Sequence, residues 1–304
     1  MTIEDALEQA CAEVGIVSPK SYRLGQWSKT DTLSRKNGKG DGRVIVNEKW
    51  ATAYNWQTGE RSTVWLDGQD SYQQRQERAD EIRRTKEKQV KDAARAAGIA
   101  TELLARATSA AHPYLISKGF NDEKGWVIGA CAVRDLGGSY LVPASGAHAL
   151  IIPARRDGRI TSAQLIWEDG TKKFLFGGEI GGACHRIATG VDTWLCEGYA
   201  TGLSVRAALR GLKVRGTVLC CFSAMNVATV ARLANGRVFI AADNDRPLET
   251  FMGLGTGEHY AKQTGLPYGV PPDVQTDFND MHQSAGIFAV QRVLTSIMAR
   301  RRHA

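Results

Sequence analysis

Hydrophobic residues near the N-terminus recur at helical spacing. The apolar positions between residues 4 and 14 fall on one face of a helix: Ala6, Leu7, Ala10, Cys11 and Val14. Short strand-like runs separated by turn residues follow at 43–47, 50–56 and 62–66. One helix and a few short strands predict a small α+β lobe over residues 1–70.

Polar and charged residues dominate the next segment, residues 71–111. Basic and acidic side chains alternate densely there, proline is absent, and only Gly98 interrupts the pattern. This predicts one or two exposed helices stabilised by charge pairs four residues apart. We expect a solvated helical connector, broken at His112-Pro113.

Residues 112–190 return to a strand pattern after a short helical piece at 113–120. Strand-like runs are expected at 126–133, 140–144, 149–156, 160–167 and 172–178. Asp157-Gly158 and Asp169-Gly170 are hairpin turn signals between the last three runs. The segment predicts an α+β lobe with β-hairpins.

From residue 191 onward, solidly hydrophobic strands alternate with helical segments. The runs at 193–196, 217–222 and 237–243 each precede a helical pattern, and a last short strand precedes residues 277–286. This alternation predicts an α/β fold in which helices cover both faces of a parallel sheet. The expected catalytic domain spans 191–286, and a C-terminal helix with a basic tail spans 287–304.

Basic residues are concentrated in one stretch of the N-terminal lobe. The chain has 39 Lys and Arg against 32 Asp and Glu, and eight of the basic residues lie between Lys20 and Lys49. A basic run also ends the chain, at 300–303. Such clustering favours a polyanionic partner, although a solvated surface with a basic tail explains it equally well.

Four tryptophans accompany the basic run of the N-terminal lobe: Trp27, Trp50, Trp56 and Trp65. Indole rings beside cations can stack on bases of a single strand. Tryptophans in a small lobe more often form its core, and we expect most of these four to do so.

Cysteine spacing and hydrophobic runs exclude several classes of protein. No run reaches the roughly 20 apolar residues of a membrane helix, and the N-terminus lacks a secretory pattern. We therefore expect a cytoplasmic protein with no membrane partner. None of the six cysteines forms a C-x-x-C pair, so no zinc is expected. Cys196, Cys220 and Cys221 are expected to be buried free thiols.

Acidic residues follow three of the predicted C-terminal strands. Glu197 follows the first, Asp243 and Asp245 the third, and Asp277 and Asp280 the fourth. Because parallel strands share one carboxyl edge, these five carboxylates are expected to converge and to require cations. Oxygen ligands suit Mg²⁺ or Mn²⁺, which support phosphoryl displacement. For any single aspartate, a helix cap or turn is at least as good an explanation.

Two motifs of the C-terminal part resemble the Toprim domain of primases, topoisomerases and some nucleases. They are LCEGYATGLS at 195–204 and IAADND at 240–245. HPYLISKGF at 112–120, the run 151–178 and TDFND at 276–280 extend the likeness to Toprim primases of phages and plasmids. The resemblance covers roughly residues 110–286, and more loosely the first 70.

The resemblance implies roles for the five acids. Glu197 would be the catalytic acid/base or a metal ligand, and Asp243 and Asp245 would be catalytic metal ligands. Asp277 and Asp280 would bind a further ion or order the site. Replicative bacterial primases usually carry an aspartate four residues after the motif glutamate, where this chain has Thr201. That departure leaves one metal contact to Asp277 or Asp280.

The resemblance also implies a DNA primase that joins NTPs into short RNA primers on single-stranded DNA. Basic residues expected to hold nucleotide are Arg155, Lys172, Lys173, Lys118 and Arg186. Residues of the N-terminal lobe expected to hold template are Arg35, Lys36 and Lys39. Two alternatives are a Toprim nuclease and a non-catalytic module for single-strand binding or helicase loading. With no P-loop and no zinc ribbon in the sequence, a replicative helicase or a zinc-bearing protein would be a separate partner.

Overall fold

The structure is a computed structural model that describes residues 1–33, 40–56, 58–66 and 72–299. It divides into two compact units, Met1–Asp80 with Pro247–Thr256, and Glu81–Arg246 with Gly257–Ala304. The five-segment division expected from the sequence stays a prediction. In the described ranges, no helix combines the length and apolar character needed to cross a membrane.

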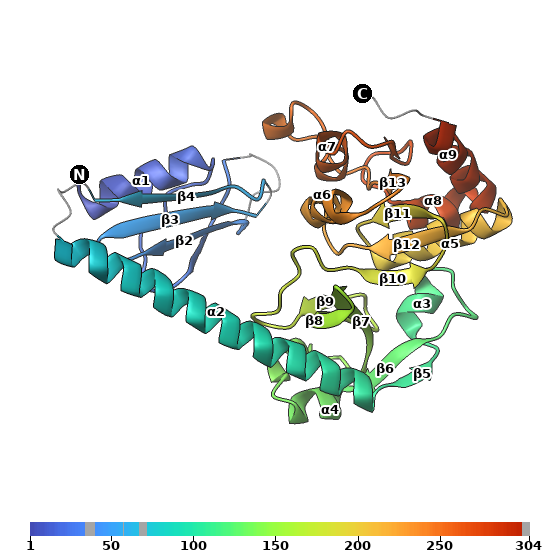
Figure 1. The fold of residues 1–304 in the computed structure, drawn as a ribbon, viewed down its shortest axis with the longest axis horizontal. Coiled ribbons are helices and arrows are strands. Elements are labelled where there is room, and N and C mark those ends of the chain that lie inside the picture. The colour runs from blue at the N-terminus through green and yellow to red at the C-terminus, as the bar shows by residue number, and fades with distance from the viewer. Residues whose placement is uncertain (34–39, 57, 67–71, 300–304) are drawn as a thin grey trace. The chain divides into compact units, whose positions relative to one another are not determined.

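The first unit is one helix on an antiparallel sheet of order β1-β2-β3-β4 (Figure 1). Its elements are α1 (Ile3–Glu13), β1 (Ser28–Thr30), β2 (Gly42–Val46), β3 (Trp50–Asn55) and β4 (Arg61–Trp65). The expected helix and three strands are confirmed, and β1 is an additional short edge strand. Thr2 caps α1, and Asp5 completes a capping box with it. A 3₁₀ turn, η2 (Glu249–Phe251), belongs to the same unit.

The core of the first unit is aliphatic, so the expectation of a tryptophan core is wrong. Ala6, Ala10, Ala51 and Ala53 are fully buried between α1 and the sheet. These small side chains bring the helix close to the strands and leave no space for an indole ring. The four tryptophans lie outside this core: Trp27 and Trp56 are 52% and 60% exposed, and Trp50 and Trp65 are half-buried.

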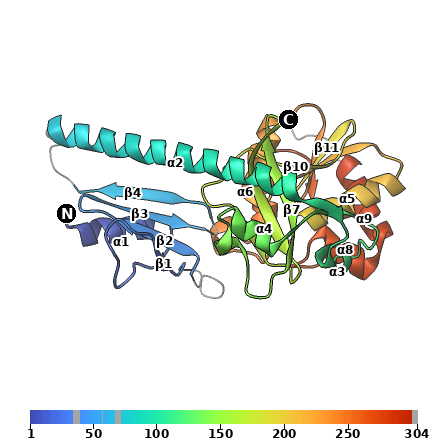
Figure 2. The ribbon, with the colours of Figure 1, turned by 90° about the horizontal axis from the view of Figure 1, so that it is seen from below.

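A single 35-residue helix, α2 (Tyr72–Arg106), follows the first sheet (Figure 2). Its surface is charged, as expected, but Ala96, Ala100 and Leu103 are buried in the core of the second unit. The end of the predicted connector is wrong, because residues 108–110 form β5 (Thr108–Ala110). Pairing of this segment with β6 (Gly125–Gly129) overrides the helical pattern.

The second unit begins with an antiparallel sheet of order β5-β6-β7-β8-β9. It contains α3 (Pro113–Ser117), β7 (His148–Arg156), β8 (Arg159–Trp167) and β9 (Lys172–Phe174). The strand expected at 126–133 is confirmed as far as Gly129 by β6, but residues 130–135 form helix α4 (Ala130–Asp135). The strand expected at 140–144 is wrong, because residues 139–141 form the 3₁₀ turn η1 (Ser139–Leu141). Gly129 ends β6 and caps α4. The expected β7–β8 hairpin is confirmed, with positive φ at both Asp157 and Gly158.

The second sheet of this unit has the order β10-β12-β11-β13-β14. Its strands are β10 (His185–Ala188), β11 (Asp192–Cys196), β12 (Gly216–Cys220), β13 (Val238–Ala241) and β14 (Tyr268–Gly269). The last four run parallel, as expected. β10 was not expected from the sequence, and it adds an antiparallel edge beside β12.

Helices cover both faces of this parallel sheet (Figure 1). One face packs against α5 (Tyr199–Gly211), α8 (Phe278–Ala285) and α9 (Ile287–Ala299). The other face packs against α6 (Ala224–Leu233) and α7 (Thr256–Gln263). Cys196, Cys220 and Cys221 are buried free thiols, as expected. The predicted α/β fold class is confirmed.

The strand order places a switch point at the carboxyl edge of β11. The chain leaves β11 through α5 to reach β12 on one side, and later returns through α6 to β13 on the other side. Ligands of open α/β sheets bind in the crevice at such a reversal. Glu197 follows β11 and Asp243 follows β13, so both acids lie at this point.

Candidate active site

Glu197 is positioned by β11, by the end of β12 and by the start of α6. The Phe222 amide donates to the Glu197 carbonyl at 2.8 Å, which continues the strand pairing past Cys196 and Cys220. The amide of Ala224, the first residue of α6, donates to the Glu197 carboxylate. A carboxylate is favoured at a helix N-terminus, so this acid has a defined position.

Asp243 and Asp245 lie in the loop after β13. The Gly257 amide, in the first turn of α7, donates to Oδ2 of Asp245 at 2.8 Å. A Cβ atom on Gly257 would lie 2.5 Å from the Asp243 carbonyl oxygen, so this approach requires glycine. The same loop pairs with the segment before α8, since the Asn244 amide donates to the Thr276 carbonyl at 3.0 Å.

Asp277 and Asp280 form the cap of α8. Asp277 accepts hydrogen bonds from the amides of Asn279 and Asp280 at 2.6 and 2.9 Å, and Asp280 accepts one from the Asp277 amide at 3.1 Å. This is a reciprocal capping box, the alternative that the sequence left open. The expectation that they end the fourth strand is wrong, because β14 ends at Gly269 and residues 270–276 intervene.

Four of the five acids act on one another electrostatically. Burial and the charge of Asp245 raise the pKa of Glu197 to about 7, and Lys172 opposes that shift. Burial and the charges of Glu197, Asp277 and Asp245 raise the pKa of Asp243 well above its ordinary value. Glu197, Asp243, Asp245 and Asp277 therefore lie close together. Asp280 is not one of these four acids, and it pairs instead with Lys118, whose Nζ lies 4.0 Å from Asp280 Oδ1.

The chemistry of this acid cluster suits a divalent cation. Asp243 Oδ1 is buried without a hydrogen-bond partner among the described residues, which is costly for a carboxylate that no cation neutralises. Oxygen ligands of this kind bind Mg²⁺ or Mn²⁺. In the part of the chain that the structure describes, no three acidic, histidine or cysteine side chains are already arranged as a ligand set. The carboxylate oxygens of this cluster are the donors that a divalent cation prefers.

The basic residues expected to hold nucleotide occupy different places. The charge of Lys172 opposes the rise that burial causes in the pKa of both Glu197 and Asp243, and its Nζ lies 5.9 Å from the centre of the Tyr114 ring. Lys118 pairs with Asp280. Lys173 donates instead to the Tyr140 carbonyl at 3.0 Å, because neighbouring side chains of a strand point to opposite faces.

The two remaining arginines are not placed beside the acids by any contact among the described residues. Arg155 and Arg186 are exposed. Burial lowers the pKa of His185, and the charge of Arg155 adds to that shift. Burial raises the pKa of Cys184, and the charge of Arg186 opposes that shift. Their nucleotide role stays a prediction. The template residues Arg35, Lys36 and Lys39 lie outside the described residues.

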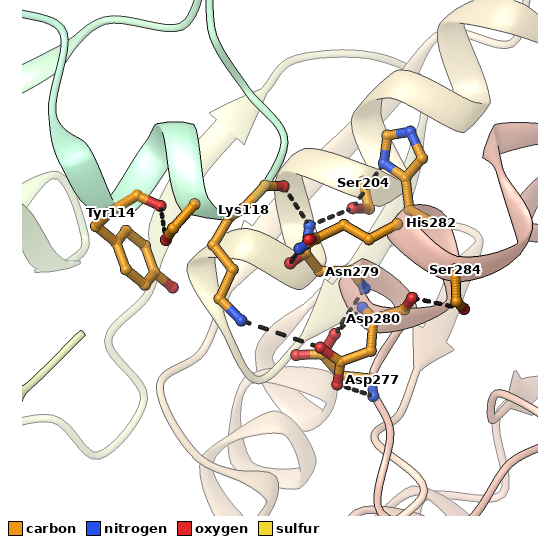
Figure 3. A network of polar contacts seen from close by, with 10 residues as sticks. Tyr114, Lys118, Ser204, Asp277, Asn279, Asp280, His282 and Ser284 are labelled. Atoms are coloured by element: carbon orange, nitrogen blue, oxygen red, sulfur yellow. Dashed lines mark hydrogen bonds and ion pairs between the residues drawn. The ribbon is translucent and has the colours of Figure 1, made fainter. Parts of the chain in front are cut away.

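A buried polar network beside the acids was missed from the sequence (Figure 3). Asn279 is fully buried, and its Nδ2 donates to the Lys118 carbonyl at 2.9 Å and to Ser204 Oγ at 3.2 Å. Ser204 in turn contacts His282 Nδ1 at 3.2 Å. One amide thus joins α3, α5 and α8 and fixes both partners of the Lys118–Asp280 pair. The only signal in the sequence is an asparagine between two motif aspartates.

A second buried amide fixes the loop around Glu197. Asn226 Nδ2 donates to the carbonyls of Ala183 and Cys221 at 2.8 and 2.7 Å, and its Oδ1 accepts from the Gly182 amide at 2.7 Å. Cys221 precedes the residue that pairs with Glu197. Asn226 stands within a helical pattern whose other residues indicate apolar packing, so its role was not predictable from the sequence.

Comparison with known proteins identifies the domain that carries these acids. Residues 192–287, from the start of β11 to the start of α9, match the Toprim domain family. The match covers less than half of the chain. It includes Glu197, the motif glutamate expected from the sequence, and Thr201 stands four residues later, buried and with its Oγ1 lacking a partner among the described residues.

About half of the chain is similar to a known primase. It is 27% identical over 164 residues to DNA primase TraC of Escherichia coli. The alignment covers 52% of this chain and 14% of TraC, so the chain spans a small part of that relative's length. This match agrees with the resemblance to Toprim primases of phages and plasmids that the motifs beyond the Toprim domain indicate.

A partial match was also found among solved structures. It contains bacteriophage T7 lagging-strand DNA polymerase interacting with primase domains of two gp4 subunits, bound to an RNA/DNA hybrid and dTTP. The TM-score is 0.36 with 15% identity, over 52% of this chain and 80% of that one. A TM-score this low does not establish a common fold, and no conclusion about function follows from it.

Proposed function

We propose that this protein is a DNA primase that joins NTPs into short RNA primers on single-stranded DNA. The observation that carries the proposal is the acid cluster at the switch point of the Toprim domain, with Lys172 beside it. Phosphoryl transfer needs closely placed carboxylates for cations and a positive group for phosphate. The similarity to DNA primase TraC supports nucleotide joining as the reaction.

The proposed role of each residue follows from its surroundings. Asp243, Asp245 and Asp277 would hold Mg²⁺ or Mn²⁺, which supplies charge stabilisation for the phosphoryl group. Glu197, with a pKa of about 7, is suited to accept the proton of the attacking 3′-hydroxyl. Lys172 would bind nucleotide phosphate, and Lys118 would orient Asp280 through their ion pair. The amides of Asn279 and Asn226 fix the elements that carry these groups.

Single-stranded DNA template and NTPs are the proposed partners, and a replicative helicase or zinc-bearing protein would act as a separate chain. Arg35, Lys36 and Lys39 remain the proposed template residues. Replacing all three with alanine is expected to flatten the slope of log affinity against log salt by about two units if each contacts a phosphate. An unchanged slope would remove them from the template path.

A primer-synthesis assay tests the proposed reaction. The full chain is incubated with a degenerate single-stranded template and labelled NTPs in Mg²⁺ or Mn²⁺, with Asp245→Asn as the inactive control. We expect template-dependent RNA products that also form under zinc chelation once Mg²⁺ is restored. Cleavage of the DNA without RNA synthesis would indicate the nuclease alternative. Template binding without either reaction would indicate a non-catalytic module.

A further inference from the structure

The sheet of the first unit has a second face, opposite α1, with an unusual composition. Strand register places its residues in three rows across the sheet. The first row crosses all four strands and contains Lys29, Arg43, Tyr54 and Arg61. The second contains Ile45, Thr52 and Thr63, and the third contains Trp50 and Trp65. We name these nine residues, together with Trp56 whose ring meets Tyr54, the aromatic face.

The charge of the aromatic face has a single sign. Lys29, Arg43 and Arg61 are cationic, and none of the nine residues is acidic. Lys29 and Arg61 are exposed, on the two edge strands β1 and β4. The Arg43 guanidinium donates to the carbonyls of Gly40 and Gly42, which fixes it beside Tyr54. Cations thus line one end of the face from edge to edge.

Aromatic rings occupy two positions on this side of the sheet. The rings of Trp50 and Trp65 pair across β3 and β4, with centroids 5.8 Å apart. Tyr54 meets Trp56 edge-to-face at 5.1 Å, and the Trp56 indole is 60% exposed. Four residues of extended chain separate Trp50 from Tyr54, so the two positions lie about 13 Å apart.

The aliphatic core under α1 does not include these rings. The opposite face of the same strands buries Val44, Val46, Ala51, Ala53 and Val64 against α1. That side forms the core, and the aromatic residues contribute nothing to it. A basic row beside aromatic rings on a sheet is the arrangement with which proteins bind single strands: bases stack on the rings, and cations bind the phosphates.

We propose that the aromatic face binds single-stranded nucleic acid. Bases stack on Trp56 and Tyr54 and on the Trp50–Trp65 pair, while Lys29 and Arg61 bind phosphates. The absence of acids among the nine residues and the chain's net charge of +7 favour a polyanion over a protein partner. Only the identity of the strand as primer template rests on the proposed function.

Stacking is tested by binding of a labelled oligothymidylate to the full chain in EDTA, measured by fluorescence anisotropy. Trp56→Ala is expected to raise the Kd roughly 5- to 150-fold, as loss of one base-stacking contact does. Trp56→Phe should recover most of the affinity. Phe288→Ala removes another exposed ring, 74% exposed in α9, and should have no effect. Equal Kd values for Trp56→Ala and Phe288→Ala would overturn the proposal.

The phosphate contacts are tested with salt. The double variant Lys29→Ala/Arg61→Ala should flatten the slope of log affinity against log salt by about 1.4, which is 0.7 per phosphate contact. Arg134→Ala/Arg232→Ala removes the same charge from exposed positions on α4 and α6 and should leave the slope unchanged. Equal slopes for the two double variants would overturn the assignment of Lys29 and Arg61.

The proposal of strand binding and the proposal of primer synthesis can each fail without the other. If the wild-type chain makes no primers but binds the strand in a Trp56-dependent way, the primase proposal fails and the aromatic face is supported. If the chain makes primers and Trp56→Ala binds template as the wild type does, the primase proposal stands and the aromatic face is excluded. The same variants therefore separate the two conclusions.

Discussion

Asp243 differs from the other acids because no helix satisfies it. Asp245 and Asp277 accept amide hydrogen bonds at the starts of α7 and α8, while Asp243 Oδ1 is buried without a partner among the described residues. A capping carboxylate contributes to folding whether or not a cation is present. Asp243 Oδ1 has no such hydrogen bond among the described residues, so we expect a bound cation to offset the cost of burying this carboxylate.

Asp243→Asn is therefore expected to separate stability from activity. Primer synthesis should fall by at least about 100-fold, because a cation ligand loses its charge. In EDTA, the Tm should rise by roughly 2–4 °C for each kcal/mol gained, because a buried, repelled carboxylate is removed. Asp122→Asn, at an exposed position, should change neither quantity. Near wild-type synthesis by Asp243→Asn in Mg²⁺ would contradict the metal assignment.

Glu197 makes the stability of the metal-free chain depend on pH. Its pKa is 4.5 in the unfolded chain and about 7 in the folded one. Between pH 4.5 and about pH 7, the folded chain binds a proton at Glu197 that the unfolded chain does not, so the stability of the fold decreases as pH rises. The side chain introduced by Glu197→Gln is uncharged at every pH, so this variant does not lose stability in this way as pH rises. The Tm of Glu197→Gln minus that of the wild type should be near zero below pH 4.5 and grow up to pH 7.

The difference between the two proteins is measured in EDTA by thermal unfolding across this pH range. Titration of groups that do not interact with Glu197, such as the buried His185 with a pKa of about 4, is common to both and cancels. The difference includes the part of the Asp243 titration that the charge of Glu197 causes. Glu102→Gln, exposed on α2, serves as the matched control. A difference that is constant with pH would show that Glu197 ionises normally in the folded chain.

Sequence reasoning at the residue scale identified acids but not the groups that fix them. Glu197, Asp243 and Asp245 stand out because carboxylates follow apolar strands. Asn279 and Asn226 do not, because their function is to satisfy backbone carbonyls from distant parts of the chain. Hydrogen bonds between distant parts of the chain depend on tertiary structure, so they are not predictable from a single sequence.

Elements were predictable where periodicity and length were both strong. The helices α5 and α6 and the strands β11, β12 and β13 follow the sequence pattern within a few residues. Short apolar segments were ambiguous: residues 130–135 look like a strand but form α4, where Ala130 and Val133 pack on one helical face. The edge strand β10 was missed because its four residues owe their conformation to β12.

The contact between α7 and the loop after β13 supplies a prediction at the element scale. A Cβ on Gly257 meets the Asp243 backbone, so Gly257→Ala must displace that loop. We expect destabilisation of about 1–3 kcal/mol. Synthesis should fall up to about 100-fold if the acids shift by 1 Å. Thermal unfolding and primer synthesis measure the two effects.

The control for this change is Gly98→Ala, on the exposed surface of α2. A Cβ at Gly98 meets nothing within 4 Å, and alanine favours the helix by about 1 kcal/mol. The control should keep full activity and gain stability slightly. If Gly257→Ala behaved in the same way as Gly98→Ala, the close approach of α7 would have no role in positioning the acids.

At the scale of the whole molecule, the two compact units have separate cores. The first unit has one aliphatic core under α1, and the second has three clusters around its two sheets. Sequence composition showed the change from basic lobe to α/β domain. It could not show that residues 247–256 cluster with the N-terminal unit, since that depends on contacts between distant segments. Separate cores imply that the units can unfold separately.

The last prediction uses this separation to locate cation binding. All four interacting acids belong to the second unit, so Mg²⁺ or Mn²⁺ should stabilise only that unit. Stabilisation follows RT ln(1 + [L]/Kd), or about 1.4 kcal/mol at ten times the Kd. Calorimetry of the full chain should show two transitions. Divalent ion should raise the Tm of one, and oligothymidylate in EDTA should raise the other.

Variants assign each transition to its unit. Asp243→Asn should abolish the response to divalent ion and leave the response to oligothymidylate, whereas Trp56→Ala should do the reverse. Asp243 belongs to the second unit and Trp56 to the first, so neither variant should alter both responses. Loss of both responses in either variant would mean that the chain unfolds as one cooperative unit. In that case, cation binding and strand binding would stabilise a shared structure.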